Sequence, residues 1–319
     1  MSSYIAWLDA SAAATPERIG GKGASLAKLG AAGFPVPPGF AVTVDAYRLY
    51  HQAAGIDELI APLAGLPSRP PAAEVRQHCL PILERLESAP LPRQVRPLLC
   101  GAVAELLKRA GDAATLAVRS SGVSEDGAAA SFAGLYDSYL NLRDEEAVLA
   151  AVERCYRCLW EPRAAHYRAI KGIDHSREAM AVVVMQTVRS AVSGVAFSMN
   201  PVTGAQDEVL INASWGLGEA IVSGLVTPDN YLAGKDGGIR QRDIAEKAVR
   251  VAAVEGGTEQ QEVPGHLAWS PALSDAQVVE VARVVTDIEA HYGCPIDVEF
   301  AYDGDGRLYL LQARPITAL

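Results

Sequence analysis

The sequence lacks long hydrophobic runs, and this shortage excludes the simplest membrane proteins. Its longest apolar stretch, AMAVVVM at residues 179–185, is far shorter than the roughly 20 residues that a membrane-spanning helix needs. The N-terminal residues MSSYIAWLDA contain no basic segment followed by a long apolar core, so they do not resemble a secretory signal. We therefore expect a cytoplasmic protein without a membrane span.

Basic residues are also scarce. The chain has 28 Lys and Arg against 38 Asp and Glu, which gives a formal net charge of −10. A surface of that sign repels a nucleic-acid backbone, so we expect no nucleic-acid partner. A local basic cleft for a small phosphate compound remains compatible with this composition.

Cysteine is rare, with five residues in 319. An odd number spread over a long chain is typical of reduced thiols in a cytosolic compartment. Cys155 and Cys158 form a C-x-x-C pair, but the surrounding pattern is helical and no second pair accompanies it. A zinc site needs about four ligands, so we interpret these two residues as structural thiols.

The length allows two domains, and the local patterns mix helices with strands. Apolar spacing predicts helices over residues 95–109, 144–170 and 274–292, and a glycine-rich loop running into a short helix over 20–29. Predicted strands cover residues 116–118, 136–142, 181–188 paired with 194–197, 208–213, and a closing hairpin of 296–302 and 307–313 joined by Asp-Gly-Asp-Gly. This mixture predicts an α+β fold.

Two segments in the first half of the chain are candidates for phosphate binding. In Gly20-Gly21-Lys22-Gly23, glycines allow backbone amides to approach an anion and the lysine can neutralise its charge. An ordinary turn explains the same residues. Arg119 follows an apolar strand and precedes two serines and a glycine, a placement that suits phosphate clamping. The alternative is a surface arginine paired with Glu125 or Asp126.

The C-terminal hairpin carries a candidate metal site. Asp297 and Glu299 are two residues apart on one predicted strand, so they lie on the same face, and Gln312 and Arg314 do the same on its neighbour. Two carboxylates on one face repel each other unless a cation lies between them. Oxygen ligands on adjacent strands are typical of Mg²⁺ bound with nucleotide phosphates, although an exposed strand face with alternating charges fits the same pattern.

Five blocks of this sequence, in order, resemble a known family. They are GGKGASLAKLGAAGFPVPPGFAVT, AVRSSGVSEDGAAASFAGLYDSYLNL, SGVAFSMNPVTG, ASWGLGEAIVSG followed by PDNY, and DVEFAYDGDGRLYLLQARPIT. Together they are similar to the nucleotide-binding domain shared by pyruvate phosphate dikinase, phosphoenolpyruvate synthase and rifampicin phosphotransferase. The resemblance extends from about residue 15 to residue 317, nearly the whole chain.

The resemblance implies an ATP-grasp fold, in which two α+β lobes enclose MgATP. We expect an N-terminal lobe with the phosphate-binding loops at residues 1–189 and a C-terminal lobe with the metal and phosphate ligands at 190–319. It also implies a role for each matching residue. Lys22 and Arg119 would contact the triphosphate, Gly134 and Ser138 would belong to a phosphate-covering loop, and Gln186 would lie on the adenine-binding strand. Glu299, with Asp297 and Gln312, would hold Mg²⁺, and Gln312 and Arg314 would contact phosphates.

The resemblance also implies a partner that this sequence does not contain. In the family, ATP phosphorylates a histidine on a separate mobile domain, which passes the group to an acceptor. None of the six histidines here lies in the Thr-Ser-His-Ala-like context of that residue. We therefore expect the ATP-binding component of a dikinase-type phosphotransferase, with Lys22, Arg119 and Arg314 as catalytic residues and the histidine-bearing and acceptor-binding parts on another domain or subunit. A free-standing ATP-grasp kinase or ligase and a non-catalytic ATP sensor are the alternatives.

Overall fold

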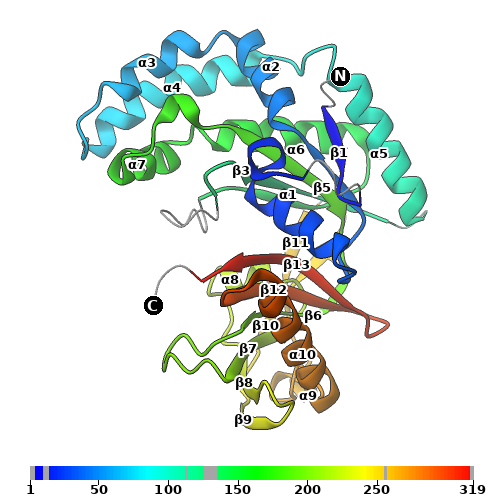
Figure 1. Cartoon of the computed structure of the whole chain (residues 1–319). Helices are drawn as coiled ribbons and strands as arrows, with labels where there is room; N and C mark the ends of the chain where they lie inside the picture. Colours follow the sequence, from blue (N-terminus) through cyan, green and yellow to red (C-terminus); the bar gives the residue numbers. More distant parts are fainter. Residues whose placement is uncertain (1–3, 10–13, 112–113, 126–134, 255–256, 317–319) are drawn as a thin grey trace. The chain divides into compact units, whose positions relative to one another are not determined.

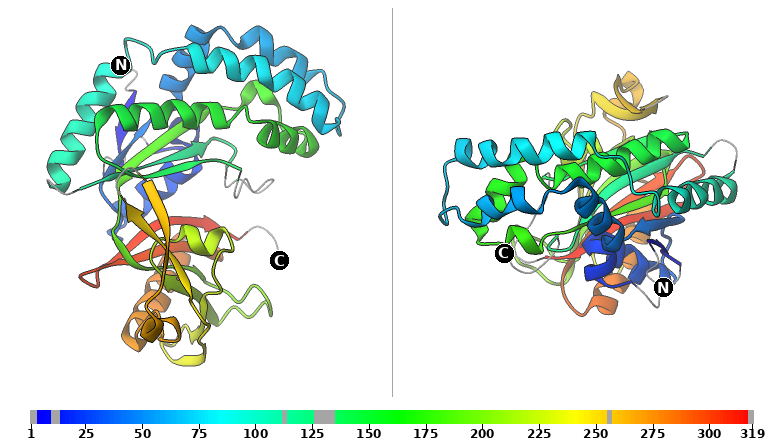
Figure 2. Two further views of the ribbon diagram at one scale, coloured as in Figure 1. Left: turned by 180° about the vertical axis from the view of Figure 1, so that it is seen from behind. Right: turned by 90° about the horizontal axis from the view of Figure 1, so that it is seen from above.

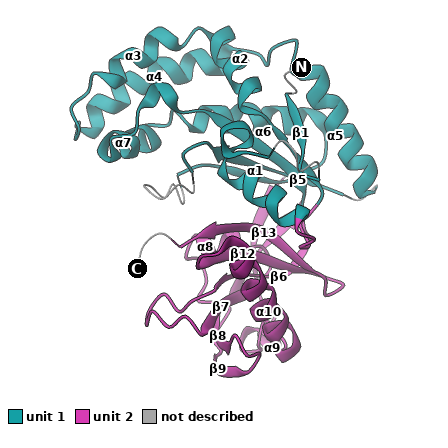
Figure 3. Cartoon of the chain, viewed as in Figure 1, with its two compact units in different colours: residues 1–31, 38–187 teal, residues 32–37, 188–319 magenta. Residues whose placement is uncertain are grey.

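The computed structural model describes residues 4–9, 14–111, 114–125, 135–254 and 257–316. The chain divides into two compact units, one made of residues 1–31 and 38–187 and the other of residues 32–37 and 188–319 (Figure 3). The predicted split at residue 189 was contiguous, whereas the structure assigns the short proline-containing segment 32–37 to the second unit. Within the described residues, no helix is long and apolar enough to cross a membrane.

The first unit is built on a five-stranded antiparallel sheet with the order β1-β2-β5-β3-β4 (Figure 1). Its strands are β1 (Ile5–Trp7), β2 (Gly39–Val42), β3 (Leu116–Gly122), β4 (Ser138–Leu142) and β5 (Met180–Gln186). Strand β5 is central, and its run of valines is buried. A strand covered on both faces reads as a continuous apolar run, which explains why this segment is the most hydrophobic of the chain.

Helices cover both faces of this sheet (Figures 1 and 2). One face packs against α6 (Glu145–Cys158) and contributes alternate residues, among them Val118 and Val184, to the main hydrophobic core. Helix α1 (Pro16–Ala31) lies on the other face, against β3 and β5. The remaining helices are α2 (Val44–Ala54), α3 (Asp57–Ala64), α4 (Ala72–Ser88), α5 (Arg96–Ala110) and α7 (Pro162–Lys171).

The second unit contains a six-stranded antiparallel sheet with the order β13-β12-β6-β7-β8-β9. The strands are β6 (Ser190–Phe197), β7 (Glu208–Trp215), β8 (Asp229–Gly234), β9 (Ile239–Asp243), β12 (Ile296–Asp303) and β13 (Leu308–Pro315). A separate hairpin is formed by β10 (Val249–Val254) and β11 (Gly257–Glu262), and two short helices are α8 (Glu219–Val222) and α9 (Gly265–Ala268).

Helix α10 (Asp275–Tyr292) covers one face of the six-stranded sheet. It begins at a capping box. The Ser274 hydroxyl accepts from the backbone amide of Gln277, and the side-chain oxygen of Gln277 accepts from the backbone amide of Ser274. Tyr302 on β12 donates to Glu280 of this helix over 2.8 Å, which identifies the covered face. Glu299, three residues before Tyr302, therefore lies on the opposite face.

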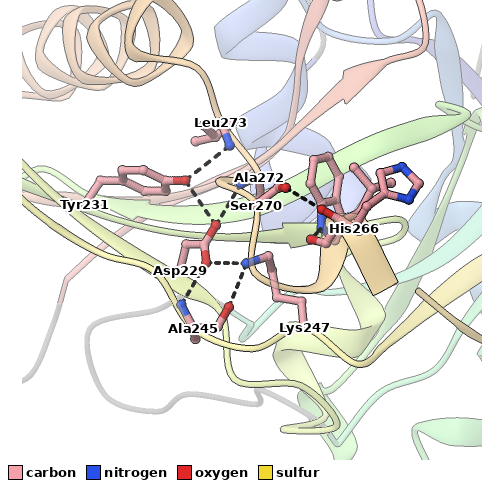
Figure 4. Close-up of polar contacts among 10 residues, drawn as sticks. Asp229, Tyr231, Ala245, Lys247, His266, Ser270, Ala272 and Leu273 are labelled. Atoms are coloured by element: carbon pink, nitrogen blue, oxygen red, sulfur yellow. Dashed lines mark hydrogen bonds and ion pairs between the residues drawn. The ribbon is translucent and has the colours of Figure 1, made fainter. Parts of the chain in front are cut away.

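A buried ion pair supports the strands of the second unit (Figure 4). The Lys247 ammonium donates to Asp229 over 2.5 Å, and both side chains are completely buried. The same carboxylate accepts from the amides of Ala245 and Ala272 and from the Tyr231 hydroxyl. Asp229 and Tyr231 belong to the PDNY block, so this block serves the packing of β8, since burying a carboxylate requires that its oxygens be hydrogen-bonded.

Three local expectations are corrected by the structure. Residues 144–170 form two helices, because Pro162 lacks the amide hydrogen that a continuous helix needs and instead starts α7. Strands β5 and β6 are not paired, and each belongs to its own sheet. The glycine-rich residues are not a loop but part of α1, which is interrupted at Gly20, where φ is 70°.

Candidate functional site

Lys22 lies just after the kink of α1, at the point where this helix meets the end of β3. The Gly23 amide donates to the Ser121 hydroxyl over 3.1 Å, and that hydroxyl donates to the Ile19 carbonyl over 2.9 Å. A Cβ atom on Gly20 would lie 2.0 Å from the Ser121 carbonyl oxygen, and the positive φ adds strain for any other residue. The glycine therefore allows the helix backbone to approach the strand, and this contact places Lys22.

Arg119 lies within β3, because the strand continues to Gly122 rather than ending at Val118 as expected. It is directly opposite Ser138 on β4 and Val183 on β5, so these three residues share one face of the sheet. Ser121, two residues further along β3, faces the same way and contacts α1. The structure thus assigns Lys22, Arg119 and Ser138 to the α1 side of the first unit.

Glu125 is a member of this group that the sequence did not assign to it. One of its carboxylate oxygens pairs with the Lys22 ammonium, and the other accepts from the Gly122 amide over 3.1 Å. The two side chains are 5% and 12% exposed, respectively, so the pair is shielded from solvent. Sequence reasoning suggests Glu125 only as a partner of Arg119, because 103 residues separate it from Lys22 and no local pattern links them.

The other two predicted residues of the first part occupy different positions. Gln186 is the last residue of β5 and is opposite Leu116, so by strand alternation it lies on the face opposite to Arg119. The backbone amide of Gln186 donates to the Pro38 carbonyl over 2.9 Å. Gly134 lies outside the described residues.

The predicted residues of the second part meet on one hairpin. In the β12–β13 register, Asp297 is opposite Arg314 and Glu299 is opposite Gln312. The expectation that these four residues share two neighbouring strands and one face is therefore confirmed. The hairpin turn also lies where the Asp-Gly-Asp-Gly sequence predicted it.

Asp297 and Arg314 form an ion pair within this group. The Arg314 Nε donates to both Asp297 oxygens, over 2.8 and 3.0 Å. Burial raises the pKa of the Asp297 carboxyl, the Arg314 guanidinium lowers it, and the nearby Glu299 carboxylate raises it. The two carboxylates are thus close enough to interact, and Arg314 supplies positive charge beside them.

A β-bulge lies beside the Glu299–Gln312 pair. Phe300 is opposite Leu310, so Leu311 is an extra residue on β13. Bulges bend a strand and re-aim the adjacent side chains, and they are frequent next to functional sites. The Leu310 amide donates to the Pro35 carbonyl over 2.8 Å, which attaches the segment 32–37 to this part of the second unit.

Two asparagines extend the same row of side chains across the sheet. Gln312, Glu299, Val195, Asn212 and Asn230 are successively opposite one another on β13, β12, β6, β7 and β8, so they share a face. The Asn212 amide nitrogen donates to the Asn230 side-chain oxygen. Sequence reasoning missed both residues, although their alternation with buried Ile211 and Tyr231 places them on the uncovered face.

The oxygen donors of this hairpin fit a magnesium ion. Glu299 and Gln312 are directly opposite on antiparallel strands, a spacing at which two side chains reach one ligand. The described residues contain no group of three or more His, Cys, Asp or Glu side chains that could hold a metal by themselves. A site with one carboxylate and one amide suits Mg²⁺, which usually takes one or two protein carboxylates and completes its shell with phosphates and water.

Two cysteines and one histidine are buried in the first unit and have structural roles. Cys155 and Cys158 are buried free thiols of α6, and burial raises the pKa of Cys158 to about 12. His175 is buried, and burial together with the Arg168 guanidinium lowers its pKa to about 4. Its Nδ1 accepts from Arg168 Nε over 3.3 Å. His266 is exposed at the start of α9.

Comparison with known proteins decides the family. The family described as "Pyruvate phosphate dikinase, AMP/ATP-binding domain" matches residues 16–319. The chain belongs to this family. The two antiparallel sheets with their covering helices confirm the α+β class that the sequence motifs predicted.

Curated relatives support the same assignment. The chain is 42% identical over 320 residues to a probable phosphoenolpyruvate synthase of Methanocaldococcus jannaschii, covering 99% of this chain and 27% of the relative. It is 37% identical to the phosphoenolpyruvate synthase of Pyrococcus furiosus, covering 99% and 44%. It is 40% identical to a rifampicin phosphotransferase of Streptomyces sp, covering 94% and 34%.

This dikinase-type domain spans less than half the length of these curated relatives. It matches the AMP/ATP-binding domain of the dikinase family, which favours neither the ligase nor the sensor alternative. Among solved structures, similarity is weak. An L-amino acid ligase from Bacillus licheniformis matches with a TM-score of 0.27 and 13% identity over 62% of this chain and 33% of that chain.

Proposed function

We propose that this chain binds MgATP and directs its β- and γ-phosphoryl groups toward a histidine on a separate domain or subunit, so that ATP and water yield AMP, inorganic phosphate and a phosphorylated histidine. The observation that carries the proposal is the pair of opposed residues on the β12–β13 hairpin, Glu299 with Gln312 and Asp297 with Arg314, in a chain of the dikinase family. The greater length of the relatives supports the existence of a further part that carries the histidine and the acceptor site.

In this proposal the two parts of the chain have complementary tasks. Residues 1–31 and 38–187 form the lobe that binds the triphosphate through Lys22, Arg119, Ser138 and Gly134. Residues 190–319 form the lobe that holds Mg²⁺ through Glu299 and Gln312, with Asp297 as their acidic companion.

The chemistry required of the chain is electrostatic. Phosphoryl transfer builds up charge on oxygens that fixed cations can stabilise, and there is little covalent chemistry for the protein to perform. Arg119 lies on a buried strand and Lys22 lies on a helix held against it, so the positions of both cations are fixed. Arg314 is held in place by Asp297. Bound Mg²⁺ would neutralise further phosphate charge.

Product analysis tests this proposal directly. The purified chain is incubated with MgATP, alone and with a histidine-bearing domain of a dikinase-type enzyme, and the nucleotides are separated by chromatography. We expect AMP, inorganic phosphate and a phosphorylated partner histidine only when the partner is present. Turnover by the chain alone with a small acceptor would instead support a free-standing kinase or ligase, and tight binding without turnover in any pairing would support a sensor.

A further inference from the structure

Glu125 has a place in the first unit that the proposed function does not use. Its carboxylate lies between two groups, the Lys22 ammonium on α1 and the Gly122 amide at the end of β3. Both members of the ion pair are largely buried. An ion pair shielded in this way is much less screened than a surface pair.

The turn that carries Glu125 is fixed independently of Lys22. The Val123 amide donates to the Ala179 carbonyl over 3.2 Å, and the Ser124 hydroxyl donates to the buried carboxylate of Glu178. The Glu125 amide also donates to the Gly122 carbonyl, over 3.4 Å. These bonds hold the Glu125 carboxylate in place before any cation reaches it.

The backbone of Lys22 is fixed as well. Ser121 binds α1 on both sides of Lys22 through the Gly23 amide and the Ile19 carbonyl, and Gly20 allows this close approach. The freedom that remains is that of the long Lys22 side chain, which is large because a lysine stem has several rotatable bonds. The Glu125 carboxylate removes that freedom.

We propose that Glu125 is a positioning residue. It holds the Lys22 ammonium in one orientation on the same face as Arg119, so that the Lys22 side chain is already ordered when the triphosphate binds. The inference rests on the proposed function, since it assigns Lys22 to the phosphates. Pre-ordering a side chain improves affinity because its entropy is not lost on binding.

Simple charge balance makes the opposite prediction. A carboxylate near a triphosphate repels it, so a Glu125 that only neutralised Lys22 would weaken ATP binding, and its removal would strengthen binding. Positioning predicts that removal weakens binding. The sign of the change therefore separates the two roles.

The test measures MgATP affinity by calorimetry for the parent chain, Glu125→Ala and Glu125→Gln, each with Lys22 intact and with Lys22→Met. We expect Glu125→Ala to raise the Kd about tenfold or more when Lys22 is present, and to change it by less than about twofold when Lys22 is absent. Glu125→Gln keeps an acceptor for the Gly122 amide but not the charge, so it should show most of the same loss. Glu146→Ala, which removes an exposed partner of Arg96, is the matched control and should leave the Kd unchanged.

A second readout needs no nucleotide. In the free protein, reductive methylation of Lys22, followed by mass spectrometry, should be slow in the parent and fast in Glu125→Ala. Unchanged or tighter binding in Glu125→Ala, an equal loss in the Lys22→Met background, full recovery in Glu125→Gln, or unchanged methylation would each overturn the positioning role. A parent chain that does not bind MgATP, with Lys22 still protected by Glu125, would overturn the proposed function instead.

Discussion

The two units assemble their candidate residues in different ways. In the second unit, Asp297, Glu299, Gln312 and Arg314 all come from one hairpin, and strand alternation alone gathers them. In the first unit, Lys22 comes from α1, Arg119 from β3 and Glu125 from the turn after it. Lys22 reaches Glu125, on the side of the sheet that Arg119 faces, only because the helix packs against the strand. A site made by a hairpin is therefore visible in a sequence, whereas one made by helix packing depends on tertiary contacts.

The largest expected effect concerns the support of the second unit. Asp229→Asn leaves the buried Lys247 ammonium without a counter-charge, so we expect the free energy of unfolding to fall by about 3–5 kcal/mol. Denaturant unfolding followed by tryptophan fluorescence measures the change. Asp207→Asn, which removes an exposed partner of Arg240, should cost much less, because exposed ion pairs contribute little to stability. Equal losses in the two variants would contradict the role of the buried pair.

The next effect compares the two sets of residues directly. Arg119→Ala in the first unit and Glu299→Ala in the second should each lower turnover by about 10²–10³, because each removes a fixed group that stabilises phosphate charge. The rate is measured as ATP-dependent phosphorylation of a histidine-bearing partner domain. Glu262→Ala, at an exposed position of β11, should keep the parental rate. A near-normal rate in either site variant would remove that residue from the site.

A pH-dependent effect is specific to the first unit. The pKa of His175 falls from 6.5 to about 4 on folding, so the folded state needs the neutral ring. The contribution of the neutral His175 ring to the free energy of unfolding is complete above pH 6.5. It is lost as the pH falls toward 4, which lowers the free energy of unfolding by about 3 kcal/mol. His175→Gln should lack this loss, which is measured as the difference in unfolding free energy between pH 7 and pH 4. Parallel pH profiles for the parent and the variant would contradict it.

The smallest effect concerns the capping box of α10. Ser274→Ala removes the acceptor for the Gln277 amide, so we expect a loss of about 1 kcal/mol in unfolding free energy. Ser223→Ala, in the short exposed α8 region, removes a bond within one turn and should be close to neutral. If both variants behaved alike, the box would not stabilise the helix that covers the second sheet.

The sequence predicted the α+β class and the closing hairpin correctly because those features depend on local periodicity and turn residues. It predicted the wrong partner for the strand at 181–188, since pairing between strands depends on the whole sheet. It missed the bulge at Leu311, which has no signal in residue type. The Lys22–Glu125 pair was beyond sequence reasoning, because it joins positions 103 residues apart. The roles of all the predicted site residues, Gln186 and Gly134 included, stay predictions.

The most direct test of the central claim is a calorimetric titration of the chain with ATP, in the presence of Mg²⁺ and in the presence of a chelator. If the chain binds MgATP as proposed, the parent should bind with Mg²⁺ and lose about tenfold or more in affinity without it. Glu299→Gln should abolish this dependence on Mg²⁺, and Lys22→Met should weaken binding under both conditions. The claim would be contradicted if the parent did not bind ATP, or if its affinity were the same with Mg²⁺ and with the chelator.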